Sequence, residues 1–243
     1  MTRCLGRKAV KTDSRTLRLA CYITPALPPP PAQVDWSPAV TGWGVLLNDQ
    51  LGDCTIAGVG HAVQTLTANV SGQAVVTDDD VLSYYKLWDG YDGTPATDNG
   101  GIELDVLNNW QKNGFAGHAL LAFAQANPAN TTEVKQAINL FGGLYIGMQV
   151  PNFIMAGPAP GVWDVTPNDG GIDGGHCVWV VGYNDDLVKF VSWGTLYEMK
   201  WAFWARYVDE AHALLSNDFI KANGLDPAGF DLSALQADLA AIV

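Results

Sequence analysis

The sequence predicts an α+β protein with a mainly antiparallel sheet, and three observations predict this class. The chain has 243 residues, 48% of them apolar, which is enough to bury a substantial core. Helix-like patterns occur in residues 33–142, and strand-like patterns occur in residues 143–200. Helices that precede the strands, instead of alternating with them, are typical of α+β folds.

Residues 1–32 are expected to form a basic, proline-rich extended arm. Residues 1–20 contain six Arg or Lys residues and one Asp, so they carry +5 in a chain of net charge −12, and the remaining residues carry −17. Residues 28–31 are all Pro, which favours a stiff, extended segment. Such an arm is expected to dock on the acidic body, on a neighbouring copy or on another polyanion. A solvated tail is the simpler alternative.

Four helices are expected in a helical part, residues 33–142. The first begins at Cys54 and has apolar residues at helical spacing. The second follows Thr77 and three aspartates, which suit a helix N-terminus, and the third stops at Gly114. The fourth follows Asn130 in a pattern that resembles a capping box. The expected ranges are 54–68, 78–88, 102–113 and 131–140.

After Gly142 the pattern changes to that of strands. The expected strands are 144–150, 177–183 and 187–193, with a hairpin turn at 184–186. Residues 201–215 have a helical pattern again, and residues 232–242 are a short amphipathic candidate. We therefore expect a β part at 143–200 and a helical C-terminal addition at 201–243.

Composition and spacing argue against several classes of function. No apolar run reaches about 18 residues, so neither a membrane span nor a membrane partner is expected. The charged N-terminus lacks the apolar stretch of a secretory signal, which favours a cytoplasmic protein with reduced thiols. The four cysteines show no C-x-x-C spacing, so we expect no metal and no other cofactor. Nucleic acid is not an expected partner either.

Cys54 and His176 are the candidate nucleophile and base. Cys54 stands at the N-terminus of the first expected helix, and His176 stands at the start of an expected strand. A helix N-terminus and a nearby imidazolium both stabilise a thiolate, which is the reactive form of cysteine. The plainer alternatives are a buried apolar cysteine and a satisfied core histidine. Cys177, next to His176 on the strand, is expected to face the other side.

Five segments in the same order resemble those of the papain-like cysteine peptidases and indicate a divergent bacterial or phage-type member. Residues 34–36 resemble the start of the mature domain, with Trp36 standing 18 residues before Cys54. Asn48 stands six residues before Cys54, where the family has a glutamine, and Gly52 also matches. The other three segments are residues 98–101, 175–183 and 191–195, which resemble the family's Cys-Asn-Gly-Gly loop, histidine strand and Asn-Ser-Trp-Gly-Thr segment. The resemblance covers about residues 33–200.

The resemblance implies a papain-like fold in which a helical left subdomain carries Cys54 and an antiparallel β right subdomain carries His176. It implies that Cys54 attacks a peptide or related amide carbonyl and that His176 transfers the proton. Asn48, together with the backbone N–H of Cys54, is the implied donor pair for the oxyanion. The substrate-binding residues that the resemblance implies are Gly52, Gly100, Gly101, Gly175 and Trp193.

The sequence departs from the family at the residue that orients the histidine. The family's asparagine falls at Val191 in the simplest alignment, and valine accepts no hydrogen bond. Ser192 is the candidate orienter after a shift of one residue, although adjacent strand residues face opposite sides. The missing asparagine need not abolish the chemistry, because cysteine is intrinsically nucleophilic.

Two classes of function follow from these patterns. The first is a cysteine hydrolase acting on peptide bonds, or on other amides, with the arm as a pro-segment or inhibitory strap. The second is a papain fold kept as a structural or binding module, for example a phage virion component that assembles or self-associates through residues 1–32. The loss of the orienting asparagine and the charged arm motivate the second hypothesis.

Overall fold

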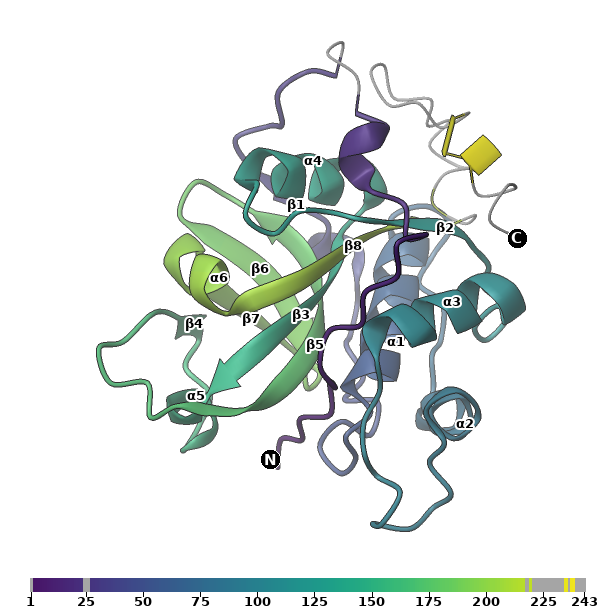
Figure 1. Cartoon of the computed structure of the whole chain (residues 1–243), viewed down its shortest axis with the longest axis vertical. Coiled ribbons are helices and arrows are strands. Elements are labelled where there is room, and N and C mark those ends of the chain that lie inside the picture. Colours follow the sequence, from purple (N-terminus) through teal and green to yellow (C-terminus); the bar gives the residue numbers. More distant parts are fainter. Residues whose placement is uncertain (1, 24–26, 217–218, 220–233, 236, 239–243) are drawn as a thin grey trace.

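The computed structural model describes residues 2–23, 27–216, 219, 234–235 and 237–238. Most of the helices lie beside one large sheet (Figure 1), so the α+β class with a helical and a β part is confirmed. No helix in the described part of the chain is long and apolar enough to cross a membrane.

The four expected helices are present, and their boundaries follow local signals. Thr77 and Asp80 form a capping box at the start of the second helix, and Gly90 ends it in the left-handed conformation. The Asn130 side chain accepts a hydrogen bond from the N–H of Glu133 and caps the fourth. The helices are α1 (Cys54–Ala68), α2 (Asp78–Asp89), α3 (Glu103–Asn113), α4 (Thr131–Phe141) and the short α5 (Asn152–Met155) and α6 (Trp201–Tyr207).

One sheet contains all the strands named in the described residues. Its order is β2-β8-β3-β5-β6-β7-β4, with β1 paired to β5, and every pairing except β4 with β7 is antiparallel. The strands are β1 (Val34–Asp35), β2 (Leu120–Gln125), β3 (Leu144–Pro151), β4 (Val162–Trp163), β5 (Ile172–Tyr183), β6 (Leu187–Ser192), β7 (Thr195–Lys200) and β8 (Val208–Ser216). The expected hairpin joins β5 to β6 through residues 184–186.

The expected helix over residues 201–215 is wrong beyond residue 207, and so is the description of residues 201–243 as a helical addition. Strand β8 follows α6 directly and lies between β2 and β3 inside the sheet. Its residues are buried on both faces except Asp209, and the run Val-Asp-Glu-Ala-His-Ala-Leu-Leu-Ser has no consistent period that separates strand from helix. Strand β2 also lies within the part expected to be helical. Residues 232–242 fall mostly outside the described residues.

Helix α1 lies at the junction between the two parts of the molecule. All of its residues from Cys54 to Thr67 are buried, and it packs against β5. Tyr145 on β3 donates a hydrogen bond from its hydroxyl to the Thr55 carbonyl at 2.8 Å, which ties the first turn of the helix to the sheet. A helix buried on all sides is held by packing rather than by an exposed polar face. The start of α1 is therefore fixed against the strand that carries His176.

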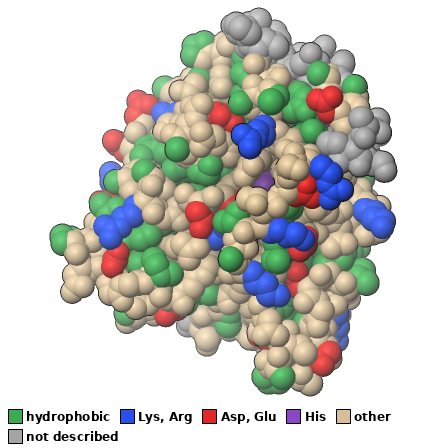
Figure 2. Space-filling model, viewed as in Figure 1, with side chains coloured by type: hydrophobic (Ala, Val, Ile, Leu, Met, Phe, Trp, Pro, Cys, Tyr) green, Lys and Arg blue, Asp and Glu red, His purple; other side chains and the backbone are tan. Residues whose placement is uncertain are grey.

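The described residues of the arm cross the face where the helical and β parts meet (Figure 1). A turn at residues 14–15 and a short 3₁₀ turn, Leu19–Cys21, interrupt the extended course of residues 2–23. Arg7 forms isolated bridges to Gly101 on one side and to Gly175 on the other. Lys and Arg side chains are scattered over the same face among Asp and Glu (Figure 2). Arg7 pairs with Glu103 at 3.0 Å and Lys11 with Asp105 at 2.6 Å, so the basic arm docks on its own acidic body.

Candidate active site

Cys54 is the first residue of α1, and its thiol is covered. The side chain is 1% exposed. Burial raises the pKa of the Cys54 thiol to about 12, although the backbone N–H groups of Cys177 and Gly6 act in the opposite direction. Cys177 directly follows His176, so the thiol lies against the backbone of the histidine strand. In this closed arrangement Cys54 is a neutral thiol.

His176 lies on β5 and is fully buried. Its Nε2 lies 2.7 Å from the Ser192 Oγ, and its ring stacks on Trp193 with the ring centroids 4.6 Å apart. The Nδ1 is buried and has no hydrogen-bond partner among the described residues. Burial lowers the pKa of His176 to about 3, with smaller contributions from His61, Arg7 and Arg3. A neutral imidazole whose Nε2–H is donated to Ser192 keeps a free lone pair on Nδ1.

The end of β6 explains why Ser192, and not Val191, meets the histidine. Val191 is fully buried in the core that contains Trp179, the residue opposite it on β5. Ser192 is the next residue and faces the other side of the strand. Trp193 and Gly194 then form the two-residue turn to β7, both with positive φ (47° and 69°), as a tight hairpin requires. That turn places the Trp193 ring over His176.

Asn48 lies near the cysteine but is engaged elsewhere. Its Nδ2 donates to the Leu51 carbonyl at 3.2 Å and to Asp53 Oδ1 at 3.1 Å, and its backbone carbonyl accepts from the N–H of Cys4 at 3.0 Å. Asp53 is fully buried, and burial raises the pKa of its carboxyl well above the usual range. The role of Asn48 as an oxyanion donor stays a prediction, because it requires the amide to turn away from Asp53.

The arm lies on all the residues that were expected to bind substrate. The N–H of Gly101 donates to the Gly6 carbonyl at 2.9 Å, and the Gly101 carbonyl accepts from the N–H of Lys8 at 2.8 Å. On the opposite edge, the N–H of Arg7 donates to the Gly175 carbonyl at 3.0 Å. Hydrogen bonds from both sides to an extended chain are the pattern by which sheet edges bind peptides.

The remaining contacts of the arm complete this pattern. A Cβ at Gly6 would overlap the carbonyl of Gly52, and a Cβ at Gly100 would overlap the carbonyl of Gly6. The Trp193 Nε1 donates to the Cys4 carbonyl at 3.1 Å, and the Arg3 guanidinium lies 5.3 Å from the Trp193 ring centroid. The glycines thus allow a close approach of two backbones.

A network that the sequence did not predict supports the glycine loop. Asp98 Oδ1 accepts from the N–H of Gly52 at 2.9 Å and from the Tyr85 hydroxyl at 2.6 Å. The Tyr85 oxygen in turn accepts from the N–H of Gly100 at 2.9 Å. Asp98 stands where the resemblance would place a cysteine, so hydrogen bonds connect this loop to the segment before Cys54. No local pattern indicated Tyr85, which comes from α2.

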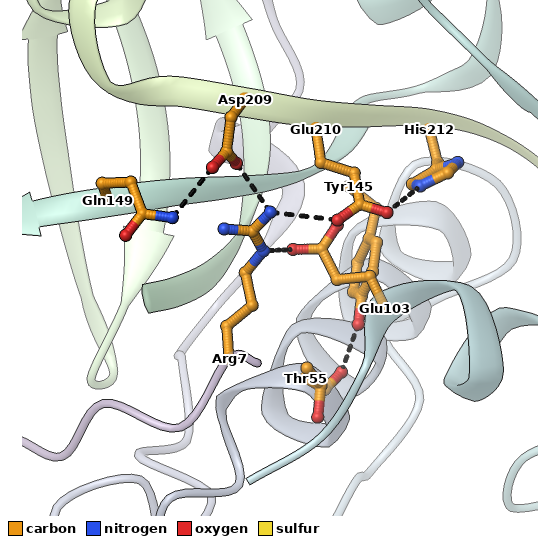
Figure 3. A network of polar contacts seen from close by, with 8 residues as sticks. All are labelled: Arg7, Thr55, Glu103, Tyr145, Gln149, Asp209, Glu210 and His212. Carbon is orange, nitrogen blue, oxygen red and sulfur yellow. Dashed lines mark hydrogen bonds and ion pairs between the residues drawn. The ribbon is translucent and has the colours of Figure 1, made fainter. Parts of the chain in front are cut away.

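A buried cluster of charged side chains lies under the arm (Figure 3). Arg7 enters it from the arm, Glu103 from the first turn of α3, and Glu210 and His212 from β8. The His212 Nε2 lies 3.0 Å from Glu210 Oε1. Ligand atoms of Glu103, Glu210 and His212 lie within 4.8 Å of one another, as in a metal site, but the Arg7 guanidinium supplies the positive charge at this place.

His61 lies on α1, and its ring also connects two segments. Its Nε2 lies 2.8 Å from the Gly44 carbonyl, and burial lowers the pKa of His61 to about 4. The unfolded chain therefore takes up a proton below about pH 6.5 while the folded chain stays neutral until about pH 4. We expect the free energy of unfolding to fall by about 3 kcal/mol over this range because of His61.

Urea titrations at pH 4.5 and pH 7.5 test this expectation. In His61→Gln, whose amide can still donate to Gly44, the difference between the two pH values should shrink, and the stability at pH 7.5 should change little. An unchanged pH difference in the variant would contradict the assignment.

The comparisons with known proteins identify the fold. Xylellain, a cysteine protease from Xylella fastidiosa, is 17% identical, with a TM-score of 0.69 over 88% of this chain and 96% of that chain. Procathepsin B S9 from Trypanosoma congolense is 13% identical, with a TM-score of 0.66 over 88% and 87%. Digestive procathepsin L 3 of Tenebrio molitor is 15% identical, with a TM-score of 0.59 over 84% and 75%. No protein-family model and no curated protein matches the sequence.

These similarities confirm the papain-like fold that the sequence predicted. At 13–17% identity they concern the fold alone, so the chemistry of this chain depends on its own residues.

Proposed function

We propose that the protein is a cysteine hydrolase that cleaves peptide or related amide bonds and that its N-terminal arm holds it inactive. The observation that supports this best is the arm itself, because its backbone bonds to Gly101 and Gly175 in the manner of a bound peptide, directly over Cys54. A site that binds an extended chain beside a cysteine and a histidine has the parts needed for acyl transfer.

In the proposed reaction the thiol proton of Cys54 passes to Nδ1 of His176. The sulfur forms a bond to the carbonyl carbon of the substrate, and the carbonyl oxygen takes up the electron pair as an oxyanion. The N–H of Cys54 at the first turn of α1 is a donor for this oxyanion, and Asn48 is the second candidate. His176 returns the proton to the amine as the C–N bond breaks, and water then hydrolyses the thioester.

The arm is not cleaved in this proposal, because it presents the wrong group to the thiol. The N–H of Gly6 acts on the Cys54 sulfur, whereas the Gly6 carbonyl bonds to the N–H of Gly101. The arm therefore presents an amide hydrogen to the thiol, while the oxygen of the Gly6 carbonyl is held by Gly101. The arm also removes water from the pair, which keeps Cys54 as a thiol and His176 as a neutral imidazole.

Alkylation by iodoacetamide, followed by mass spectrometry of the peptides, tests this function. Cys54 should react more slowly than the exposed Cys21 in the full chain, and faster than Cys21 once the arm is displaced. Cys54→Ala should remove all hydrolysis of a casein or peptide mixture by the arm-displaced protein, and Cys21→Ala should remove none. Hydrolysis that persists in Cys54→Ala, or a Cys54 that stays inert without the arm, would overturn the proposal.

The alternative function, a structural or binding module such as a virion component, stays a prediction, as do self-association through residues 1–32 and a cytoplasmic location. An arm-displaced protein without hydrolytic activity that forms larger assemblies in size-exclusion chromatography would favour it.

A further inference from the structure

Arg7 is the arm residue whose charged side chain is buried most completely. The residue is 5% exposed and its side chain is 0% exposed. The Nε lies 3.0 Å from Glu103 Oε1, and Nη2 lies 2.6 Å from Asp209 Oδ1 and 3.0 Å from Glu210 Oε2 (Figure 3). The guanidinium is therefore surrounded by carboxylates from two elements of the body that are far apart in the sequence.

Both the shape and the charge of the pocket fit the Arg7 guanidinium. Gly147, in the middle of β3, lies beside the guanidinium, and a Cβ there would overlap the Nε and Cζ of Arg7 and a carboxylate oxygen of Glu103. Gln149, also on β3, donates to Asp209 Oδ2 at 2.9 Å and holds that carboxylate in place. A planar cation with several donors fits such a site better than a compact ammonium group.

The two buried glutamates differ in how strongly they need a cation at this place. Burial raises the pKa of Glu103 well above its usual range, and the neighbouring Glu210 raises it further. Burial also acts to raise the pKa of Glu210, but His212 and Arg7 lower it more, so Glu210 is ionised. A buried carboxylate that loses its partner is strongly destabilising. Glu210 thus loses one of its two cationic partners whenever Arg7 leaves.

The backbone of the arm, in contrast, is bound by contacts that any extended peptide can make. Arg7 lies between Gly101 and Gly175, which bind only main-chain groups. A peptide placed on the same two edges would direct one side chain into the pocket, one residue away from the position that faces Cys54. Side-chain selection at this position is then made by the carboxylates.

We propose that Glu103, Asp209 and Glu210 form the specificity pocket of the site, that it selects an arginine side chain of the substrate, and that Arg7 occupies it as a built-in competitor. The statement that a substrate fills this pocket rests on the proposed function. The recognition of arginine, however, can be measured without catalysis.

The experiment uses full-length protein with Gly6→Ala and Arg7→Ala, which displaces the arm and empties the pocket. The probe is a fluorescent peptide with the sequence of residues 2–12, and its matched control has leucine in place of the arginine at position 7. Fluorescence anisotropy should show binding of the first peptide that is stronger by on the order of 30-fold or more. The ratio of the two affinities is also measured in the Gly6→Ala single variant. The same ratio there would show that the preference does not come from misfolding of the double variant.

Pocket variants identify the residues responsible. Glu210→Gln in the same background should reduce the preference for the arginine peptide by about tenfold or more, and Asp186→Asn in the β5–β6 turn should leave it unchanged. Equal binding of the two peptides would overturn the inference, and so would a preference that Glu210→Gln does not change.

Hydrolysis separates this inference from the proposed function. With alanine-based peptide amides that carry Arg, Lys, Leu or Glu at each of the two positions before the cleavable bond, Arg should give the highest kcat/KM at one position. Cleavage without a preference for Arg would overturn the assignment of the specificity pocket but would leave the proposed hydrolase function intact. Selective binding without any cleavage would overturn the proposed function, and with it the assignment of the pocket to a substrate.

Discussion

Replacing Gly6 with alanine should accelerate the alkylation of Cys54 about a hundredfold. The Cβ would overlap the Gly52 carbonyl, and both partners are backbone, so no side-chain rotation relieves the contact. Overpacking of this kind typically costs 1–3 kcal/mol, and the upper end corresponds to about a hundredfold larger population of the displaced arm. The alkylation rate of a covered thiol follows that population when opening is fast.

The measurement compares initial alkylation rates of Cys54 and Cys21 in the same sample. Gly42→Ala is the matched control, because nothing lies within 4 Å of the Cβ it would add, and it should leave both rates unchanged. Gly6→Ala changes the arm and not the body, so the circular dichroism spectrum of the folded protein should be preserved. A Cys54 rate equal to that of the parent would mean that the arm does not control access to the thiol.

Replacing Ser192 with alanine should lower kcat by on the order of a hundredfold in the Gly6→Ala background, with little change in KM. The Ser192 Oγ is the hydrogen-bond partner of the His176 Nε2, at 2.7 Å. Without it, nothing among the described contacts holds the proton on Nε2 and the lone pair on Nδ1, and loss of the correct tautomer and orientation lowers the rate of general-base catalysis. The unpaired buried nitrogen should also lower stability by about 1–3 kcal/mol.

Two asparagine variants make this prediction specific. Ser192→Asn supplies a carbonyl acceptor on the side of the strand that faces His176, so it should retain more activity than Ser192→Ala. Val191→Asn places the same amide in the core beside Trp179, where it cannot reach the histidine. Added to Ser192→Ala, it should lower stability and should not restore activity. Equal kcat in Ser192→Ala and its parent would show that Ser192 does not orient the base.

The elements that could be predicted are those whose signals are local. Thr77 with Asp80, Asn130 with Glu133, and Gly114 lie at the ends that they determine, because a cap acts on backbone groups within one turn. The strand with His176 and the hairpin after it were likewise visible in a run of apolar residues and a polar turn.

Strand β8 was misassigned because its place depends on distant partners. Both of its edges are paired, with β2 and β3, and its residues from Glu210 to Ser216 are buried. The polar pair Asp209–Glu210 and the apolar pair Leu214–Leu215 interrupt the alternation from polar to apolar. A sequence without that alternation fits a buried strand and a helix equally well. Because this strand was assigned as a helix, the positions of Asp209 and Glu210 on it were also missed. The acidic pocket could therefore not be predicted.

The sequence by itself determined the α+β class, the helix that begins at Cys54, the strand of His176 and the basic charge of the arm, because capping signals and apolar runs act over short distances. Its resemblance to the papain-like peptidases, and not these local signals, predicted the papain-like fold. Only the tertiary structure decided that Ser192 meets His176, that the arm binds to its own body across the site, and that Arg7 meets Glu103 and Glu210. These contacts join residues separated by up to 203 positions, and the sheet pairing that brings them together is a property of the whole fold and of no local pattern.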